Sequence, residues 1–157
     1  MKKVTNLMTQ WFSGGKLHRE TGPAIEWNDG NKTWYYNGKI HREDGPAVLN
    51  TNGDVLYLID GKFSREDGPA KILKSGRKEW YKRGMLHRED GPAIESEDGD
   101  NYWYVYNSLH RDGDLPAIEY SDGEKHWYSK GLRHRENGPA IESEHIVEYW
   151  INGKKIK

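Results

Sequence analysis

The sequence predicts an all-β fold, an elongated single-layer antiparallel meander of about six stacked β-hairpin repeats. Three observations lead to this prediction. One motif is written six times at a nearly constant spacing, and turn signals give the copies one common strand register. Apolar residues make up only 34% of the chain, which suits a repeat array in which each repeat buries its face on its neighbours.

The repeated motif is clearest at residues 87–95, which read His-Arg-Glu-Asp-Gly-Pro-Ala-Ile-Glu. Its copies lie 23 or 24 residues apart and begin at His18, His41, Ser64, His87, His110 and His134. An aromatic residue stands seven positions before each start: Trp11, Trp34, Tyr57, Trp80, Trp103 and Trp127. A fixed period of this length is typical of repeat proteins. We therefore expect one repeat domain, 1–157, with repeats starting near 11, 34, 57, 80, 103 and 127.

The ends of the chain are expected to be caps. Residues 1–10 resemble half a repeat and are assigned to an N-terminal capping hairpin, and residues 150–157 to a C-terminal cap strand. No stretch shows the 3.6-residue apolar period of an amphipathic helix, so no helix is expected.

Each repeat is expected to contain a short strand, a two-residue turn and a return strand. Asp98-Gly99 is such a turn, and counting outward from it places Ile94 directly opposite Trp103. The same count from the equivalent turns opposes Ile25 to Trp34, Val48 to Tyr57 and Ile118 to Trp127. We expect these pairs on one face of one sheet, where apolar cross-strand pairs stabilise by roughly 0.2–1 kcal/mol each.

A second turn closes each repeat, for example Asn37-Gly38 or Lys130-Gly131. The motif loop then leads to the next strand, which its proline opens, because the missing N–H of proline costs least at the start of a strand.

Composition excludes several classes of protein. Lys and Arg total 24 against 25 Asp and Glu, so a nucleic-acid partner is not expected. There is no cysteine, hence no disulfide framework and no thiolate metal site. No run of 18 apolar residues and no signal-peptide core is present, and a cytoplasmic protein is expected.

The His-Arg-Glu loops invite a catalytic or metal-binding interpretation. Equivalent histidines would lie about 10 Å apart, too far to share one metal whose ligands stand about 2 Å away. We favour a structural ladder between loops, in which arginines bind carboxylates of adjacent loops. It comprises Arg42, Arg65, Arg88 and Arg111 with carboxylates such as Glu43, Glu66 and Glu89. No catalytic residue, metal or cofactor is expected.

The tryptophan–tyrosine pairs have two interpretations. They could form a platform that stacks a ligand, or they could form the core of a thin sheet, which we favour. The residues assigned to the repeat scaffold are Trp34, Trp80, Trp103, Trp127, Arg42, Arg88, Glu89 and Pro92.

Residues 37–41, Asn-Gly-Lys-Ile-His, resemble the MORN repeat. The pattern Trp-Tyr-x-x-Gly-x-x-His-Arg-Glu-Asp-Gly-Pro-Ala-Ile-Glu resembles the MORN-variant repeats of phage, large-DNA-virus and bacterial proteins, over about residues 11–157. The resemblance implies an elongated β-hairpin array with a binding or scaffolding role, and some bacterial members are antitoxin-like.

The third repeat departs most from the pattern. It has Tyr57 for tryptophan, Ser64 for histidine and Lys71 for isoleucine. We expect an apolar island of Leu49, Leu56 and Ile72 on the face that carries Glu95, Glu119 and Glu142 elsewhere. The partner surface assigned here comprises Leu49, Leu56, Tyr57, Ile59, Lys71, Ile72, Leu73 and Tyr81. Neutral variation in a middle repeat is the alternative.

The expected function is non-catalytic binding of another protein, as an inhibitor or antitoxin-like protein that sequesters a host factor. One alternative is a lipid-headgroup or membrane-surface module, against which the near-neutral charge argues. Another is an enzyme with a site in the irregular third or fifth repeat. Open sheet edges would also allow homo-oligomers.

Overall fold

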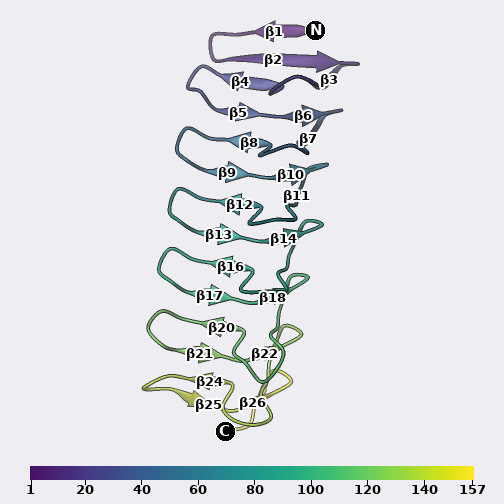
Figure 1. Cartoon of the computed structure of the whole chain (residues 1–157). Coiled ribbons are helices and arrows are strands. Elements are labelled where there is room, and N and C mark those ends of the chain that lie inside the picture. The colour runs from purple at the N-terminus through teal and green to yellow at the C-terminus, as the bar shows by residue number, and fades with distance from the viewer. The chain divides into compact units, whose positions relative to one another are not determined.

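The computed structural model describes all 157 residues, which form two compact units, Met1–Gly76 and Arg77–Lys157. Both units contain only strands, turns and loops, and every strand pair is antiparallel. The predicted all-β class and the predicted order of consecutive hairpins are therefore confirmed (Figure 1).

In the first unit, neighbouring sheet strands follow chain order. They are β1 (Lys2–Val4), β2 (Met8–Ser13), β4 (Ile25–Trp27), β5 (Lys32–Thr33), β8 (Val48–Leu49), β9 (Val55–Leu56) and β12 (Lys71–Ile72). Short hairpin strands branch from this sheet: β3 (Lys16–Leu17), β6 (Tyr35–Tyr36) with β7 (Lys39–Ile40), and β10 (Leu58–Ile59) with β11 (Lys62–Phe63).

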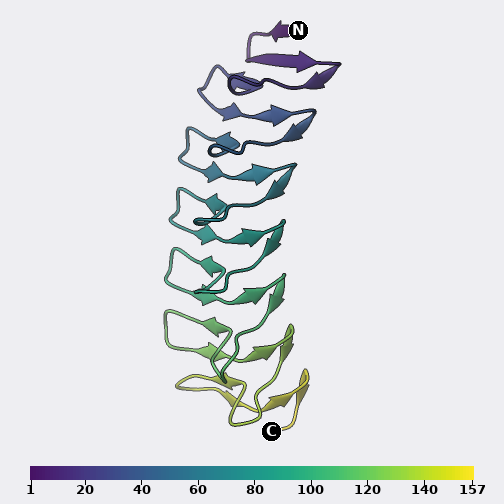
Figure 2. The same cartoon turned by 45° about the vertical axis from the view of Figure 1, so that its right-hand side comes forward.

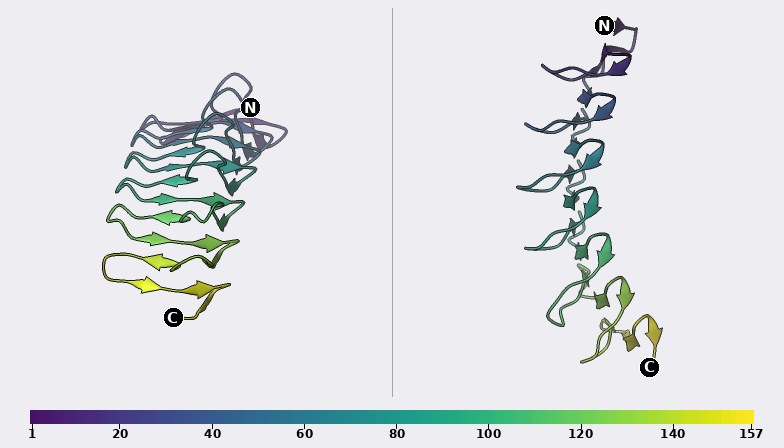
Figure 3. Two further views of the ribbon diagram at one scale, coloured as in Figure 1. Left: turned by 60° about the horizontal axis from the view of Figure 1, so that its bottom comes forward. Right: turned by 90° about the vertical axis from the view of Figure 1, so that its right-hand side faces the viewer.

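The second unit repeats this arrangement. Its sheet strands are β13 (Lys78–Glu79), β16 (Ile94–Glu95), β17 (Asn101–Tyr102), β20 (Ile118–Glu119), β21 (Lys125–His126), β24 (Ile141–Glu142) and β25 (Val147–Glu148). Its hairpins are β14 (Tyr81–Lys82) with β15 (Met85–Leu86), β18 (Tyr104–Val105) with β19 (Ser108–Leu109), β22 (Tyr128–Ser129) with β23 (Leu132–Arg133), and β26 (Trp150–Ile151) with β27 (Lys154–Lys155). Within each unit, loops of successive repeats project from the same side (Figures 2 and 3).

The Asp-Gly and Asn-Gly turns within the sheets have three-residue loops, which corrects the predicted register. The Gly99 N–H donates to the Ser96 carbonyl at 3.1 Å, and the Ser96 N–H donates to the Asp100 carbonyl at 2.9 Å. Gly99 has a φ of 90°. This is a type I turn followed by a left-handed glycine, one residue longer than the two-residue loop. Pairing therefore shifts by one residue, and a one-residue shift moves a side chain to the other face.

The four predicted isoleucine or valine pairs with aromatic residues are wrong for this reason. Ile25 faces Thr33, Val48 faces Leu56, Ile94 faces Tyr102 and Ile118 faces His126, not Trp34, Tyr57, Trp103 and Trp127. The aromatic residues instead adjoin the motif alanines, as where the Trp34 N–H donates to the Ala47 carbonyl at 2.8 Å. All six motif alanines are 0% exposed, so small residues between large rings form the core of this face.

The second turn of each repeat follows the prediction. In Asn37-Gly38 the φ angles are 49° and 83°, and the flanking residues Tyr36 and Lys39 pair directly. Two successive positive φ angles define the tight turn that matches the twist of a hairpin. Lys130-Gly131 has the same conformation, with φ angles of 51° and 83°.

The first prediction concerns this tight turn. Lys130 is exposed, makes no hydrogen bond or ion pair, and occupies the left-handed region that a lysine avoids. Asn37 and Asn152 occupy the equivalent position. We expect Lys130→Asn to stabilise the protein by about 0.5 kcal/mol, because asparagine tolerates this conformation better. Thermal unfolding measures the change, with Lys130→Val as the opposite control; a lower melting temperature for the asparagine variant would show the turn to be assigned wrongly.

Candidate partner-binding surface

Each motif loop is built around its arginine. The guanidinium carbon of Arg88 lies 4.0 Å from the ring centroid of Trp80, which is close enough for a cation–π contact. Its Nε donates to Asp90 at 2.8 Å, and its Nη1 donates to the Pro92 carbonyl at 3.2 Å and to Glu95 at 2.9 Å. A Cβ on Gly91 would lie 2.9 Å from the guanidinium carbon. The guanidinium is thus clamped between an aromatic ring and a glycine.

The clamp recurs in every repeat. Ring–guanidinium distances of 3.8–4.2 Å are found for Arg19 on Trp11, Arg42 on Trp34, Arg65 on Tyr57, Arg88 on Trp80, Arg111 on Trp103 and Arg135 on Trp127. The close glycine is also present in all repeats but the fifth, where the extra residue changes the loop and both Gly113 and Asp114 have positive φ. The motif therefore specifies a loop whose arginine binds residues of the same repeat.

The predicted arginine ladder between adjacent loops is wrong for Arg42, Arg65, Arg88 and Arg111. Their side-chain partners lie in their own loops or on the strand that follows. The hydrogen bonds from Arg42, Arg65 and Arg88 lower the pKa of Asp44, Asp67 and Asp90 respectively. One arginine does bridge loops: Arg135 binds Asp114 of the fifth loop at 3.1 Å, through the residue that the insertion adds.

Three of the five motif histidines connect one repeat to the next, whereas the Nδ1 atoms of His87 and His110 are buried without a hydrogen-bond partner. His41 Nδ1 accepts a hydrogen bond from the Asp60 N–H of the next tight turn at 3.1 Å, and His18 and His134 make the same contact with Asn37 and Asn152. This bond requires the proton on Nε2 in the neutral ring, and the Nε2 of His41 faces Glu43 at 3.6 Å. The histidines thus serve the scaffold, and no group of three or more His, Cys, Asp or Glu could hold a metal ion.

The second and third repeats lack one part of the clamp. In the other four, the arginine Nη1 also contacts a glutamate on the following strand: Arg19–Glu26 at 3.1 Å, Arg88–Glu95 at 2.9 Å, Arg111–Glu119 at 2.8 Å and Arg135–Glu142 at 3.5 Å. Leu49 and Ile72 occupy this position in the second and third repeats. Arg42 and Arg65 therefore bind one carboxylate each, Asp44 and Asp67.

Three aliphatic residues form a continuous island at these positions. Val55 lies directly opposite Leu49 on one side and Ile72 on the other, on three successive strands. All three are half-buried. The predicted island had Leu56 instead of Val55, and this is wrong because the three-residue turn puts Leu56 on the other face, opposite Val48 and Lys71. Leu49 and Ile72 lie on the face expected for them.

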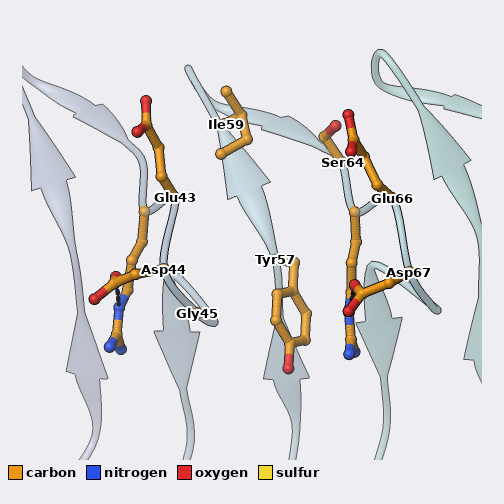
Figure 4. A pocket seen from close by; sticks show the side chains of 10 residues that line it. Glu43, Asp44, Gly45, Tyr57, Ile59, Ser64, Glu66 and Asp67 are labelled. Atoms are coloured by element: carbon orange, nitrogen blue, oxygen red, sulfur yellow. Dashed lines mark hydrogen bonds and ion pairs between the residues drawn. The ribbon is translucent and has the colours of Figure 1, made fainter.

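A groove of about 850 Å³ lies beside the third repeat, between the second and third motif loops. Tyr57, Ile59 and Ser64 line it together with residues of both loops. Figure 4 shows Tyr57 between the loops, with Glu43 and Glu66 toward the end near Ile59 and Ser64. Tyrosine and serine are smaller than the usual tryptophan and histidine, so the two substitutions leave room here.

The remaining predicted site residues do not join the island. Leu73 is in the sheet turn, where its carbonyl accepts from the Gly76 N–H at 2.9 Å. Tyr81 belongs to the second unit and donates its hydroxyl hydrogen to Glu79 at 2.7 Å, and burial raises the pKa of Tyr81.

The second unit carries a different group, in which Tyr120 makes edge contacts with Tyr102 and His126 at 6.1 and 5.2 Å between ring centroids. His126 is buried and its Nε2 lies 2.5 Å from Glu124. Burial raises the pKa of Tyr102 and Tyr120. These side chains contact one another, which indicates a packing role for the group.

No protein-family model and no curated protein matches the chain. None of its segments forms a helix that could cross a membrane.

The second prediction tests the clamp. We expect Arg88→Ala to lower the free energy of unfolding by about 2 kcal/mol, because it removes a cation–π contact and charge-assisted hydrogen bonds on a side chain only 20% exposed. Lys125→Ala, at an exposed strand position, is the control and should change stability by less than about 0.5 kcal/mol. Chemical denaturation measures both, and equal effects of the two variants would show Arg88 to be a solvated charge.

Proposed function

We propose that this chain is a non-catalytic repeat protein that binds another protein through the island of Leu49, Val55 and Ile72 and the adjoining groove. The observation that carries the proposal is the placement of the island. Leucine and isoleucine stand where four other repeats hold an arginine-bound glutamate, and valine stands where most repeats hold lysine or asparagine.

The scaffold does not require this island. The equivalent row of the second unit pairs Lys78 with Glu95, Asn101 with Glu119 and Lys125 with Glu142, and the same strands form there. An apolar cluster at the surface that folding does not require supports an interaction role. Hot spots of binding favour such apolar centres, because water leaves them readily on association.

The chemistry of the groove supports binding over catalysis. Hydrogen bonds from Arg42 and Arg65 keep the pKa of Asp44 and Asp67 below the usual range, the opposite of the shift that a general acid at neutral pH requires. The Nδ1 of His41 already accepts a backbone hydrogen bond. Sequestration of a host factor, as in the antitoxin-like proteins that the motif resembles, is the biological role we propose.

The third prediction follows from the repeat itself. Leu49→Glu with Ile72→Glu should abolish capture of the partner but preserve the fold, because glutamate at these positions would meet Arg42 and Arg65 as it meets Arg88. Quantitative mass spectrometry of proteins captured from the native host, on the wild type and on the double variant, measures the loss. Circular dichroism and the melting temperature report the fold.

The matched control is Glu142→Leu, which puts an aliphatic residue into the equivalent position of the sixth repeat. Capture should survive this change. The assignment fails if Glu142→Leu abolishes capture and the folded double variant retains it.

A further inference from the structure

The island of Leu49, Val55 and Ile72 lies next to two guanidiniums, those of Arg42 and Arg65, whose hydrogen bonds differ from those of Arg88. The Nη1 of an arginine carries two hydrogens, and in Arg88 one bonds the Pro92 carbonyl and the other bonds Glu95. In Arg42 the Nη1 bonds the Pro46 carbonyl at 3.3 Å, and in Arg65 it bonds the Pro69 carbonyl at 3.5 Å. Neither reaches a strand carboxylate, because Leu49 and Ile72 stand in that place. Each Nη1 therefore keeps one hydrogen without an acceptor in the protein, the hydrogen that in Arg88 bonds Glu95.

These two donors are well placed for a partner. The Arg42 and Arg65 side chains are 23% and 24% exposed, so water screens them less than a free surface charge. They stack on return strands that are two strand spacings apart, which corresponds to about 10 Å. Lys32 is exposed directly opposite Leu49 and adds a positive charge at the end of the island.

Building on the proposed function, we propose that the partner binds with an aliphatic segment that carries two carboxylates about 10 Å apart. Its aliphatic side chains cover Leu49, Val55 and Ile72. Its carboxylates take on Arg42 and Arg65 the place that Glu95 takes on Arg88. The other repeats are the template for the contact, since they show the same guanidinium binding a carboxylate at 2.8–3.5 Å.

A basic partner segment, attracted by the acidic residues of the groove, is the alternative, and the structure favours it less. Glu43 and Asp67 are 83% and 85% exposed, so both carboxylates stay solvated and gain little from a basic guest. Asp44 and Asp67 are also occupied by the Nε of their own arginines. A basic segment is thus the competing result that the experiment must be able to return.

The test uses a random 15-residue peptide library displayed on phage and selected on the immobilised full-length protein. We expect the enriched peptides to combine Leu, Ile or Val with two or more Asp or Glu residues. Synthetic copies should bind at least tenfold more weakly to Leu49→Glu/Ile72→Glu, whose own carboxylates occupy the arginines. Binding should persist in Glu142→Leu, which changes the equivalent strand position outside the island.

The variant Leu49→Gln/Ile72→Gln separates the two parts of the contact. It removes the apolar surface without supplying a carboxylate, so it should bind more tightly than the glutamate variant, and high salt should reduce that difference. Basic or uncharged consensus peptides, equal binding to the glutamine and glutamate variants, or no enrichment would overturn the inference. If peptides fail in this way but host-protein capture still requires the island, the proposed function stands and only the partner chemistry is wrong.

Discussion

The stacking of an arginine guanidinium on an aromatic ring is the contact on which each repeat depends. Trp80 gives its backbone N–H to the Ala93 carbonyl and its ring to Arg88, so one residue belongs to the sheet and to the loop. Such stacking contributes about 0.5–2 kcal/mol, and hydrogen bonds to charged groups about 1.5–3 kcal/mol each. Recurring in six loops, this contact lets a chain with few apolar residues cover its sheet.

The same contact explains how one repeat can differ from another without losing the fold. The ring, the glycine and the proline carbonyl hold the guanidinium whether or not a strand glutamate is present, as Arg42 shows. The strand position is therefore free to change. Glutamate there binds the arginine of its own repeat, as Glu95 binds Arg88, whereas Leu49 and Ile72 put apolar side chains in its place.

The sequence predicted the architecture but not the contacts, and the reason is geometric. Asn37-Gly38 specifies a two-residue turn because it follows a strand directly, but Asp98-Gly99 fits either a two-residue or a three-residue loop, and only the latter occurs. Because the loop is one residue longer than predicted, Val55 and not Leu56 lies opposite Leu49 in the island. The sequence did not predict the clamp, because Trp80 and Arg88 are eight positions apart and are brought together only by the hairpin between them. The irregularity of the third repeat can be recognised without a register, because it consists of residue identities such as Tyr57 and Ser64.

A double-mutant cycle on Gly91 and Arg88 tests the clamp most directly. A methyl group at Gly91 would lie 2.9 Å from the guanidinium carbon, whereas the glycine backbone itself lies outside the left-handed region. The account predicts that Gly91→Ala lowers the free energy of unfolding by about 1 kcal/mol or more when Arg88 is present, and by much less in the Arg88→Ala background. Equal costs in both backgrounds would show that the glycine serves the loop alone, and that the arginine is not clamped.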